Sequence, residues 1–235
     1  MSPPLLLLRS QIARVPSRAW LWAFAVALAV ELTAVAFGLD AVRWATKPAL
    51  TLLLLSHLIV SVAPGQAPAR LFGLGLLVAC AADLALLADG TAAFLTGMGL
   101  FAVMQVLYIA AFVKLGALQA FRNRYAVPAC YLAFWAGLIV ALWTRLGALA
   151  APVAVYSLLL VSMAALAFGL GRAREAGHLA GVGGALFVVS DLVLGLGVAG
   201  FDLPGAGLAV MSTYAAAQLL LTVGVRRHLR SPAAH

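Results

Sequence analysis

Three acidic residues fall inside long apolar runs of the chain: Glu31, Asp83 and Asp191. Ionisable groups in the apolar segments of a membrane protein are costly, and they usually face the interior of a helix bundle or a wet cavity. Two carboxyl groups in one such cavity can act as a general acid and a general base when one is protonated and the other ionised. That pairing suits hydrolysis through an oxocarbenium-like state, as in glycosidases. Asp83 and Asp191 are therefore the candidate catalytic residues.

Other polar side chains within apolar runs extend this candidate site. They are Lys47, His57, Gln105, Tyr108, Tyr156, Tyr214 and Gln218. With a helical rise of about 1.5 Å per residue, six polar residues lie roughly 5 to 12 Å from the same membrane face: Glu31, Lys47, Asp83, Tyr156, Asp191 and Tyr214. We expect one common cavity, open towards the non-cytoplasmic half of the bilayer. His57 is displaced towards the other half, which favours a structural role.

Structural roles compete with catalytic ones at each position. Asp83 and Asp191 would then only lock helices together by hydrogen bonds, and Glu31 would be a structural partner of Lys47. Lys47 precedes Pro48 at the start of an apolar run, where a lysine can extend its amine to the interface. The tyrosines would be packing residues with one hydroxyl hydrogen bond each.

The elements that must position these residues are membrane-spanning helices. Hydrophobic residues make up 65% of the 235 residues, charged residues 9%, and the mean hydropathy is +1.10. So few charges cannot cover a soluble domain, which is usually about 25% charged. The sequence predicts an all-α polytopic membrane helix bundle with about eight spans of roughly 20 residues each. The predicted spans are 20–39, 44–63, 69–88, 92–113, 125–144, 149–169, 178–199 and 206–225.

The distribution of Lys and Arg predicts the orientation and the domain organisation. Twelve basic residues precede or follow spans on one side, and Arg43, Lys47 and Arg145 lie on the other. Since basic loops stay in the cytoplasm, we expect both termini to be cytoplasmic, in a cell (inner or plasma) membrane. Residues 1–19 would be a cytoplasmic tail, and 20–228 an eight-helix bundle, so that 1–235 form a single membrane domain. Trp20, Trp22, Trp44 and Trp143 lie near predicted span ends, where indole favours the interface.

A weak internal repeat relates the two halves of the chain. Pro48 and Pro152, Asp83 and Asp191, and Tyr108 and Tyr214 are each separated by about 105 residues. An offset of four helices implies a possible 4+4 parallel repeat, and chance similarity in an apolar chain is the competing interpretation.

Several other functions lack a sequence signal. The net charge of +8 does not indicate nucleic-acid binding, because the 15 basic residues punctuate apolar runs and form no patch. Cys80 and Cys130 lie inside apolar runs, which favours packing over a disulfide or a metal site. The glycine-rich segment 195–200 has no preceding strand and is not a dinucleotide site. We therefore expect no metal, no cofactor and no nucleic-acid partner.

Six sequence blocks follow one another in the order of a known family. They are Thr46-Lys47-Pro48, Asp83 to Leu87, the set Phe94, Gly97, Phe101 and Tyr108, the pair Pro152 and Tyr156, Gly184 to Asp191 with its Ser190-Asp191, and Tyr214 to Gln218. On these blocks the chain resembles the YhhN family of membrane proteins, whose animal members include lysoplasmalogenases. The resemblance covers about residues 20 to 228. Ala82 and Gln105 depart from it, because the family usually has Gly and often has His at these positions.

The resemblance implies a membrane hydrolase that cleaves the vinyl ether bond of lysoplasmalogens to a fatty aldehyde and a glycerophospho-ethanolamine or -choline. Its substrate would be a lysophospholipid drawn from membrane lipid. One aspartate would protonate the β-carbon, while the other would stabilise the oxocarbenium ion and activate water. Which aspartate does which stays open, and so does whether Lys47 binds the phosphate or keeps an aspartate ionised. The expected substrate-binding residues are Lys47, Tyr108, Tyr156, Tyr214, Gln218, Glu31, Ser190 and Gln105.

A small proton-coupled transporter is the chief alternative, because buried carboxyl groups also relay protons in transporters. A structural or assembly factor is a third possibility, against which the buried charges argue. The sequence leaves the oligomeric state open.

Overall fold

The computed structural model describes residues 12, 14–122, 125–173 and 178–230, with the side chains of 171–173 left out. Most of the predicted cytoplasmic tail, and Arg9, Arg124 and Arg174 of the predicted basic loops, lie outside the described residues. Long helices account for most of the described chain: α2 (Ser17–Phe37), α3 (Asp40–Ser61), α4 (Ala67–Ala85), α5 (Thr91–Lys114), α6 (Ala126–Leu146), α7 (Ala150–Ala173), α8 (His178–Val198) and α9 (Ala206–Arg230). Two short 3-10 helices, Ala117–Phe121 and Gly147–Leu149, complete the described secondary structure, in which no strand occurs.

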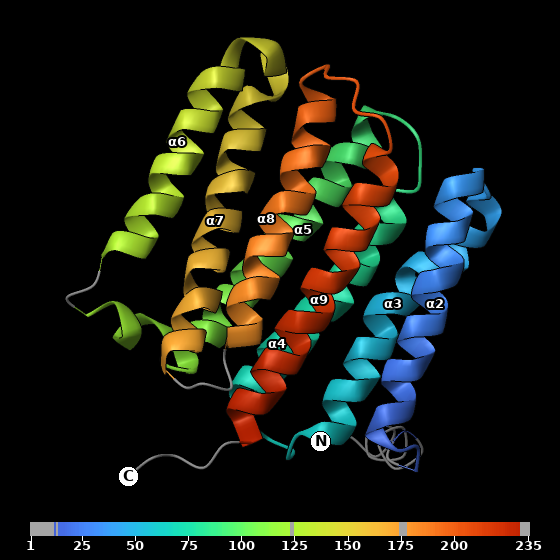
Figure 1. Cartoon of the computed structure of the whole chain (residues 1–235), viewed down its shortest axis with the longest axis vertical. Coiled ribbons are helices and arrows are strands. Elements are labelled where there is room, and N and C mark those ends of the chain that lie inside the picture. Colours follow the sequence, from blue (N-terminus) through green and yellow to red (C-terminus); the bar gives the residue numbers. More distant parts are fainter. Residues whose placement is uncertain (1–11, 13, 123–124, 174–177, 231–235) are drawn as a thin grey trace.

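These helices confirm the predicted all-α membrane architecture. The described ranges contain seven segments long and apolar enough to cross a membrane, one of which runs for 45 residues from Ala126 to Leu170. That segment is two helices, because Gly147 with its φ of +53° turns the chain between α6 and α7. Figure 1 shows α6 and α7 side by side. The predicted span boundaries agree to within a few residues except at α9, which continues to Arg230. The protein is therefore a multi-pass membrane protein.

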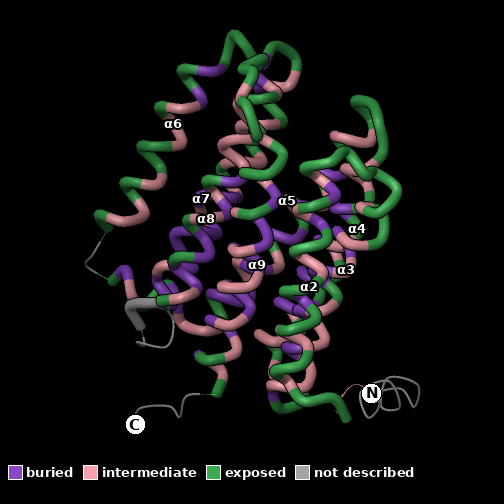
Figure 2. Tube along the Cα trace, turned by 45° about the vertical axis from the view of Figure 1, so that its right-hand side comes forward, coloured by how far each residue is buried: buried purple, intermediate pink, exposed green. Residues whose placement is uncertain are grey.

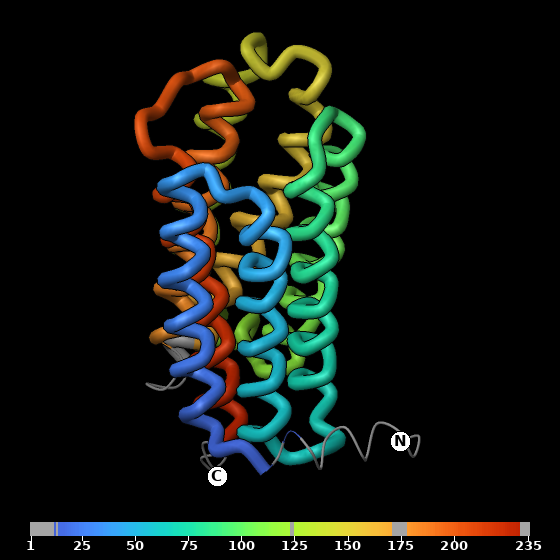
Figure 3. The backbone as a smooth tube through the Cα atoms, turned by 90° about the vertical axis from the view of Figure 1, so that its right-hand side faces the viewer, coloured from blue at the N-terminus to red at the C-terminus, as the bar shows by residue number. Residues whose placement is uncertain are grey.

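The helices form a closed ring with one helix outside it. Helices α2 to α5 pack in chain order, α5 then packs on α7, and α9 closes the ring by packing on α8, α2 and α3. Figure 3 shows α9 beside α2 and α3. Helix α6 packs chiefly on α7, at the edge of the molecule in Figure 1. The start of α2 and the end of α9 both lie at the lower end of the bundle, so the first and last helices of the ring have these ends on the same side (Figure 1).

The core lies where the ring helices meet. Figure 2 shows buried segments along α4, α5, α7, α8 and α9, whereas most of α6 is exposed or half-buried. Close approach of α8 and α9 depends on glycine. A Cβ on Gly183 would lie 2.8 Å from the backbone nitrogen of Leu221, and one on Gly224 would lie 2.6 Å from that of Ala180. Small residues at helix interfaces let backbones approach where lipid supplies little hydrophobic driving force.

The outer surface is apolar, as a lipid-facing surface must be. Trp22, Phe37 and Val140 are each exposed by more than 70%. The predicted repeat of α2–α5 on α6–α9 is not tested by these features and stays a prediction, as do the single-domain organisation and the direction in which the bundle crosses the membrane.

Candidate functional site

Asp83 lies on α4 in a closed, charged environment. Its side chain is 1% exposed, and the Nζ of Lys47 on α3 lies 3.6 Å from its Oδ1. The hydroxyl of Tyr214 on α9 donates a hydrogen bond of 2.8 Å to its Oδ2. Three helices therefore meet at this carboxylate. A buried carboxylate requires such partners, because an uncompensated charge in the interior is strongly unfavourable.

The hydrogen bonds continue from Tyr214 into the core. Gln218, one turn further along α9, donates from Nε2 to the Tyr214 hydroxyl oxygen at 3.4 Å. The hydroxyl of Tyr108 on α5 donates to Oε1 of Gln218 at 2.8 Å. The Tyr108 ring stacks on Phe72, with ring centroids 4.1 Å apart, and Gly75 leaves it room, since a Cβ there would lie 2.4 Å from the ring. We call Lys47, Asp83, Tyr108, Tyr214 and Gln218 the Asp83 cluster.

Glu31 forms a second buried ion pair next to this cluster. Its side chain is fully buried on α2 and accepts hydrogen bonds from Nε of Arg43 at 3.2 Å and from the Thr46 hydroxyl at 2.5 Å. The interpretation of Glu31 as a structural partner of Lys47 is therefore wrong, because Arg43 takes that place and Lys47 pairs with Asp83. Two roles were left open for Lys47. The pair with Asp83 favours neutralising the charge of an aspartate over binding a phosphate.

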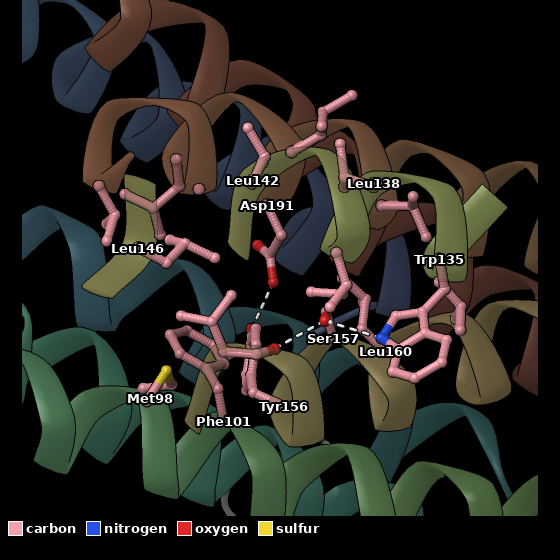
Figure 4. A pocket seen from close by; sticks show the side chains of 18 of the residues that line it. Met98, Phe101, Trp135, Leu138, Leu142, Leu146, Tyr156, Ser157, Leu160 and Asp191 are labelled. Carbon is pink, nitrogen blue, oxygen red and sulfur yellow. Dashed lines mark hydrogen bonds between the residues drawn. The ribbon is translucent and has the colours of Figure 1, made fainter. Parts of the chain in front are cut away.

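Asp191 lies on α8 and lines a pocket. The pocket is bordered by α5, α6, α7 and α8, and Figure 4 shows the Asp191 carboxyl group pointing into it. Its walls are almost wholly apolar, with Phe101 on α5, Leu138 and Leu142 on α6, and Leu160 on α7 among the lining residues. Among the described residues that line it, none is Lys, Arg or His. Asp191 thus faces apolar space rather than a cation.

The few polar groups of the pocket are bonded to one another. The Tyr156 hydroxyl donates to Oδ2 of Asp191. The indole Nε1 of Trp135 donates to the Ala154 carbonyl and the Ser157 hydroxyl oxygen, both at 3.1 Å, and Ser157 donates to the Val153 carbonyl at 2.6 Å. Figure 4 shows this row of side chains. Trp135 and Ser157 were absent from the sequence predictions. The position of Trp135 is the sequence signal that could have revealed it, because Trp135 alone among the five tryptophans lies well inside a predicted span.

The two aspartates occupy different neighbourhoods. Only Asp191 and Tyr156 of the six residues predicted to share a cavity line the described pocket. Among the described residues, no hydrogen bond or ion pair joins one carboxylate to the other. Phe101 touches both neighbourhoods, because it lines the pocket and also packs edge-on against the Tyr214 ring at 5.7 Å between centroids. This Phe101 wall lies between the pocket and Tyr214 of the Asp83 cluster.

The remaining predicted residues lie around these two neighbourhoods. Ser190 is buried and donates to the Val210 carbonyl at 3.1 Å, which ties α8 to α9. Gln105 is fully buried on α5. His57 bonds through Nδ1 to the Ser17 carbonyl at 2.8 Å and accepts from Arg226 at Nε2 at 3.2 Å, towards the lower end of the bundle. Within the described residues, no group of three or more His, Cys, Asp or Glu side chains converges as a metal site requires.

The sequence blocks that hold these residues match one family. A family model described as the YhhN family matches residues 42–225. The chain belongs to the YhhN family. In this YhhN chain, the matched range contributes every residue of the Asp83 cluster as well as Tyr156 and Asp191.

Curated proteins similar to this YhhN chain carry one functional name. The chain is 39% identical over 140 residues to lysoplasmalogenase TMEM86B of Rattus norvegicus, covering 60% of the chain and 54% of the relative. It is 37% identical over 145 residues to lysoplasmalogenase TMEM86B of Homo sapiens, covering 60% and 56%. It is 35% identical over 139 residues to lysoplasmalogenase of Mycobacterium bovis, covering 57% and 51%. The match thus spans about half the length of these relatives. No solved structure matches the chain.

Proposed function

We propose that this chain is a membrane hydrolase that cleaves the vinyl ether bond of lysoplasmalogens, releasing a fatty aldehyde and a glycerophospho-base. The observation that carries the proposal is the carboxyl group of Asp191 in an otherwise apolar pocket within a membrane protein. An acid that must protonate a carbon atom next to a hydrocarbon chain needs this combination. The names of the three relatives support the same substrate class.

The pocket is suited to a single hydrocarbon chain. Ligand pockets are mostly apolar with a few placed polar groups, and lysolipids carry one chain. Helix α6 closes the pocket from outside the ring and packs chiefly on α7. The alkenyl chain would therefore enter from the bilayer beside α6 and bring its first two carbons against Asp191 and Tyr156.

Asp191 then performs both proton transfers. The protonated carboxyl group gives its proton to the β-carbon, and the π electrons form the new C–H bond, leaving an oxocarbenium ion at the α-carbon. Water adds to the α-carbon and returns a proton to the Asp191 carboxylate. The hemiacetal collapses with proton transfer to the glycerol oxygen, which gives the aldehyde and the alcohol. Tyr156, hydrogen-bonded to Oδ2, fixes the orientation of the carboxyl group.

Asp83 does not contact the substrate in this scheme. Its carboxylate is paired with Lys47 and Tyr214, and it does not line the pocket. Its cluster joins α3, α4, α5 and α9, and the Tyr214 ring supports the Phe101 wall. We therefore propose Asp83 as a positioning residue and Asp191 as the catalytic acid and base.

The headgroup phosphate would bind at Arg145. Of the three basic residues at the upper end, Arg43 pairs with Glu31 and Asp40, and Lys47 pairs with Asp83. Arg145 directly precedes Leu146 of the pocket lining, and its guanidinium lies over the Phe201 ring, 4.6 Å from the centroid. Among the described residues, no carboxylate forms an ion pair with it. A guanidinium at the interface suits a phosphate. With phosphate bound at Arg145, the reaction would take place in the half of the membrane opposite both predicted cytoplasmic termini. A C-terminal reporter facing outside would overturn that orientation.

Aldehyde release by the purified chain tests the proposal. We expect release from lysoplasmenyl-ethanolamine or -choline and none from the matching saturated alkyl ether, because that compound has no double bond to protonate. Wild-type protein that releases no aldehyde across pH and head groups would exclude the enzyme and leave a proton-coupled transporter to be tested by uptake into vesicles.

A further inference from the structure

The pocket that Asp191 lines ends a short way below this residue. On α8, the lining residues run from Val188 to Val198, with Asp191 between them. With a rise of about 1.5 Å per residue, the pocket extends about 5 Å below Asp191 and about 10 Å above it. On α6, the lowest described lining residue is Phe134, although the helix begins at Ala126. The part of the pocket that lies below the acid is therefore short.

Trp135 lies at this lower end, and its ring is held in place. Its Nε1 donates to the Ala154 carbonyl and to the Ser157 hydroxyl oxygen on α7, both at 3.1 Å. Figure 4 shows the Trp135 indole and Leu146 on opposite sides of Asp191. Because rotation of the ring would break both hydrogen bonds, the indole forms a fixed wall of the pocket.

Phe134, next to Trp135 in the chain, lies at the edge of the pocket towards lipid. It lines the pocket and is also 44% exposed. Other lining residues of the lower end are exposed by only 3 to 7%: Phe101, Leu160 and Val161. Leu194, which also lines the pocket and is 37% exposed, lies three residues after Asp191, towards the upper end. A hydrocarbon chain that meets Trp135 at the lower end therefore has a lipid-facing way out past Phe134.

We propose that Trp135 is a specificity-determining residue that stops the hydrocarbon chain below Asp191 and turns the rest of it past Phe134 into the bilayer. The inference rests on the proposed function, because it takes the alkenyl double bond to lie at Asp191. One helical turn is about 5.4 Å, which leaves room for only a few methylene groups between the acid and the indole. The remaining carbons stay among lipid chains, which are as apolar as leucine side chains. The pocket thus selects for the shape of the chain next to the ether bond and not for the shape of its far end.

A branch in the chain tests this wall. Lysoplasmenyl-ethanolamines with a dimethyl branch moved stepwise along the alkenyl chain are compared with the straight-chain substrate. A branch within the first few carbons beyond the double bond should lower kcat/KM of the wild type about tenfold to a hundredfold, because overpacking against a fixed wall is that unfavourable. A branch near the chain end should have no effect. Trp135→Ala should relieve the effect of the near branch, and Trp135→Phe, which retains a ring, should keep most of it.

The ratio of kcat/KM for branched and straight chains within one variant is a readout that a general loss of folded protein does not move. Trp143→Ala is the matched control, because Trp143 lies on the same helix, is 49% exposed and is not among the described lining residues. Its ratio should equal that of the wild type. An unchanged ratio in Trp135→Ala, or an equal effect of branches at every position in the wild type, would overturn the role of Trp135 and leave the hydrolase intact.

Fluorescence quenching by bromine follows the chain without hydrolysis. A saturated alkyl ether lysolipid carries bromine at one chosen carbon, and the emission of Trp135 is the difference between the wild type and Trp135→Phe. Bromine a few carbons from the ether should quench this emission most, and bromine at the chain end should quench it least. Equal or stronger quenching from the chain end would overturn the proposal. Position-dependent quenching in a wild type that releases no aldehyde would overturn the hydrolase and leave the turn of the chain at Trp135 in place.

Discussion

Asp83 and Asp191 lie in different surroundings. Asp83 belongs to a buried ion pair, whereas Asp191 faces an apolar pocket. Asp83 is held by Lys47 at 3.6 Å and by Tyr214 at 2.8 Å, in a part of the ring where Arg43 and Glu31 form a further pair. Asp191 has one neutral partner, Tyr156, and faces an apolar pocket. Both residues follow a similar apolar pattern in sequence. Under the proposed function, the charge of the neighbours, and not the carboxyl group itself, would separate the positioning aspartate from the catalytic one.

The largest expected effect comes from Asp191→Asn. An asparagine keeps the shape and the bond to Tyr156 but cannot donate a proton to carbon. General acid–base catalysis contributes about 10²- to 10⁴-fold, so aldehyde release should fall by that factor. The unfolding temperature should be unchanged, because no cation loses its partner. Asp89→Asn, in an exposed turn, is the matched control and should retain full activity. Retained activity in Asp191→Asn would remove Asp191 from the chemistry.

Asp83→Asn should act on stability instead. Lys47 would be left as an uncompensated buried charge, which costs about 3 to 5 kcal/mol. Thermal unfolding in detergent measures the loss. The double variant with Lys47→Met removes both charges and should recover most of the stability and part of the aldehyde release. A double variant that is no more stable than Asp83→Asn would show that the ion pair is not the reason for the buried carboxylate.

Variants of the two tyrosines that donate hydrogen bonds to the aspartates test the same difference between the two sites. Tyr156→Phe removes the hydroxyl that orients Asp191 and should lower kcat about tenfold, the loss of one hydrogen bond worth about 1.4 kcal/mol in the transition state. Tyr214→Phe removes the bond to Asp83 and should lower stability by about 1 kcal/mol with little change in kcat. Measurements of kcat and of the unfolding temperature on both variants distinguish an effect on catalysis from an effect on stability. Equal effects on both quantities in both variants would erase the distinction between the two sites.

The smallest effect is expected at the surface. Arg145→Met should raise KM several-fold for lysoplasmenyl-ethanolamine, because an exposed phosphate contact contributes about 1 kcal/mol. It should leave KM unchanged for the corresponding 1-alkenylglycerol, which has no phosphate. Arg43→Met is a poor substitute, since it would unpair Glu31. An equal rise in KM for both lipids would assign Arg145 to packing against Phe201 instead.

The sequence predicted the elements well and the partners of the acids poorly. Apolar runs of spanning length and the turns at Asp89-Gly90 and Pro204-Gly205 placed the helices to within a few residues, because the bilayer sets the length of each span. The blocks of the family pattern supplied both aspartates. The sequence missed Trp135 and Ser157, and its structural alternative for Glu31 named Lys47 as the partner, where the structure has Arg43. Depth along a helix says how far a residue lies from the membrane face, but it does not say which helix lies opposite.

The sequence by itself determined a multi-pass helical membrane protein with a few buried polar residues near one depth, because hydropathy and helix geometry act locally along the chain. Only the tertiary structure decided that α9 brings Tyr214 to Asp83, that α7 brings Tyr156 to Asp191, and that α6 packs outside the ring to enclose an apolar pocket. The physical reason is that the partner of a buried charge is set by the rotation and order of helices around the bundle. Those depend on packing between segments a hundred or more residues apart, such as Gln218 on Tyr108.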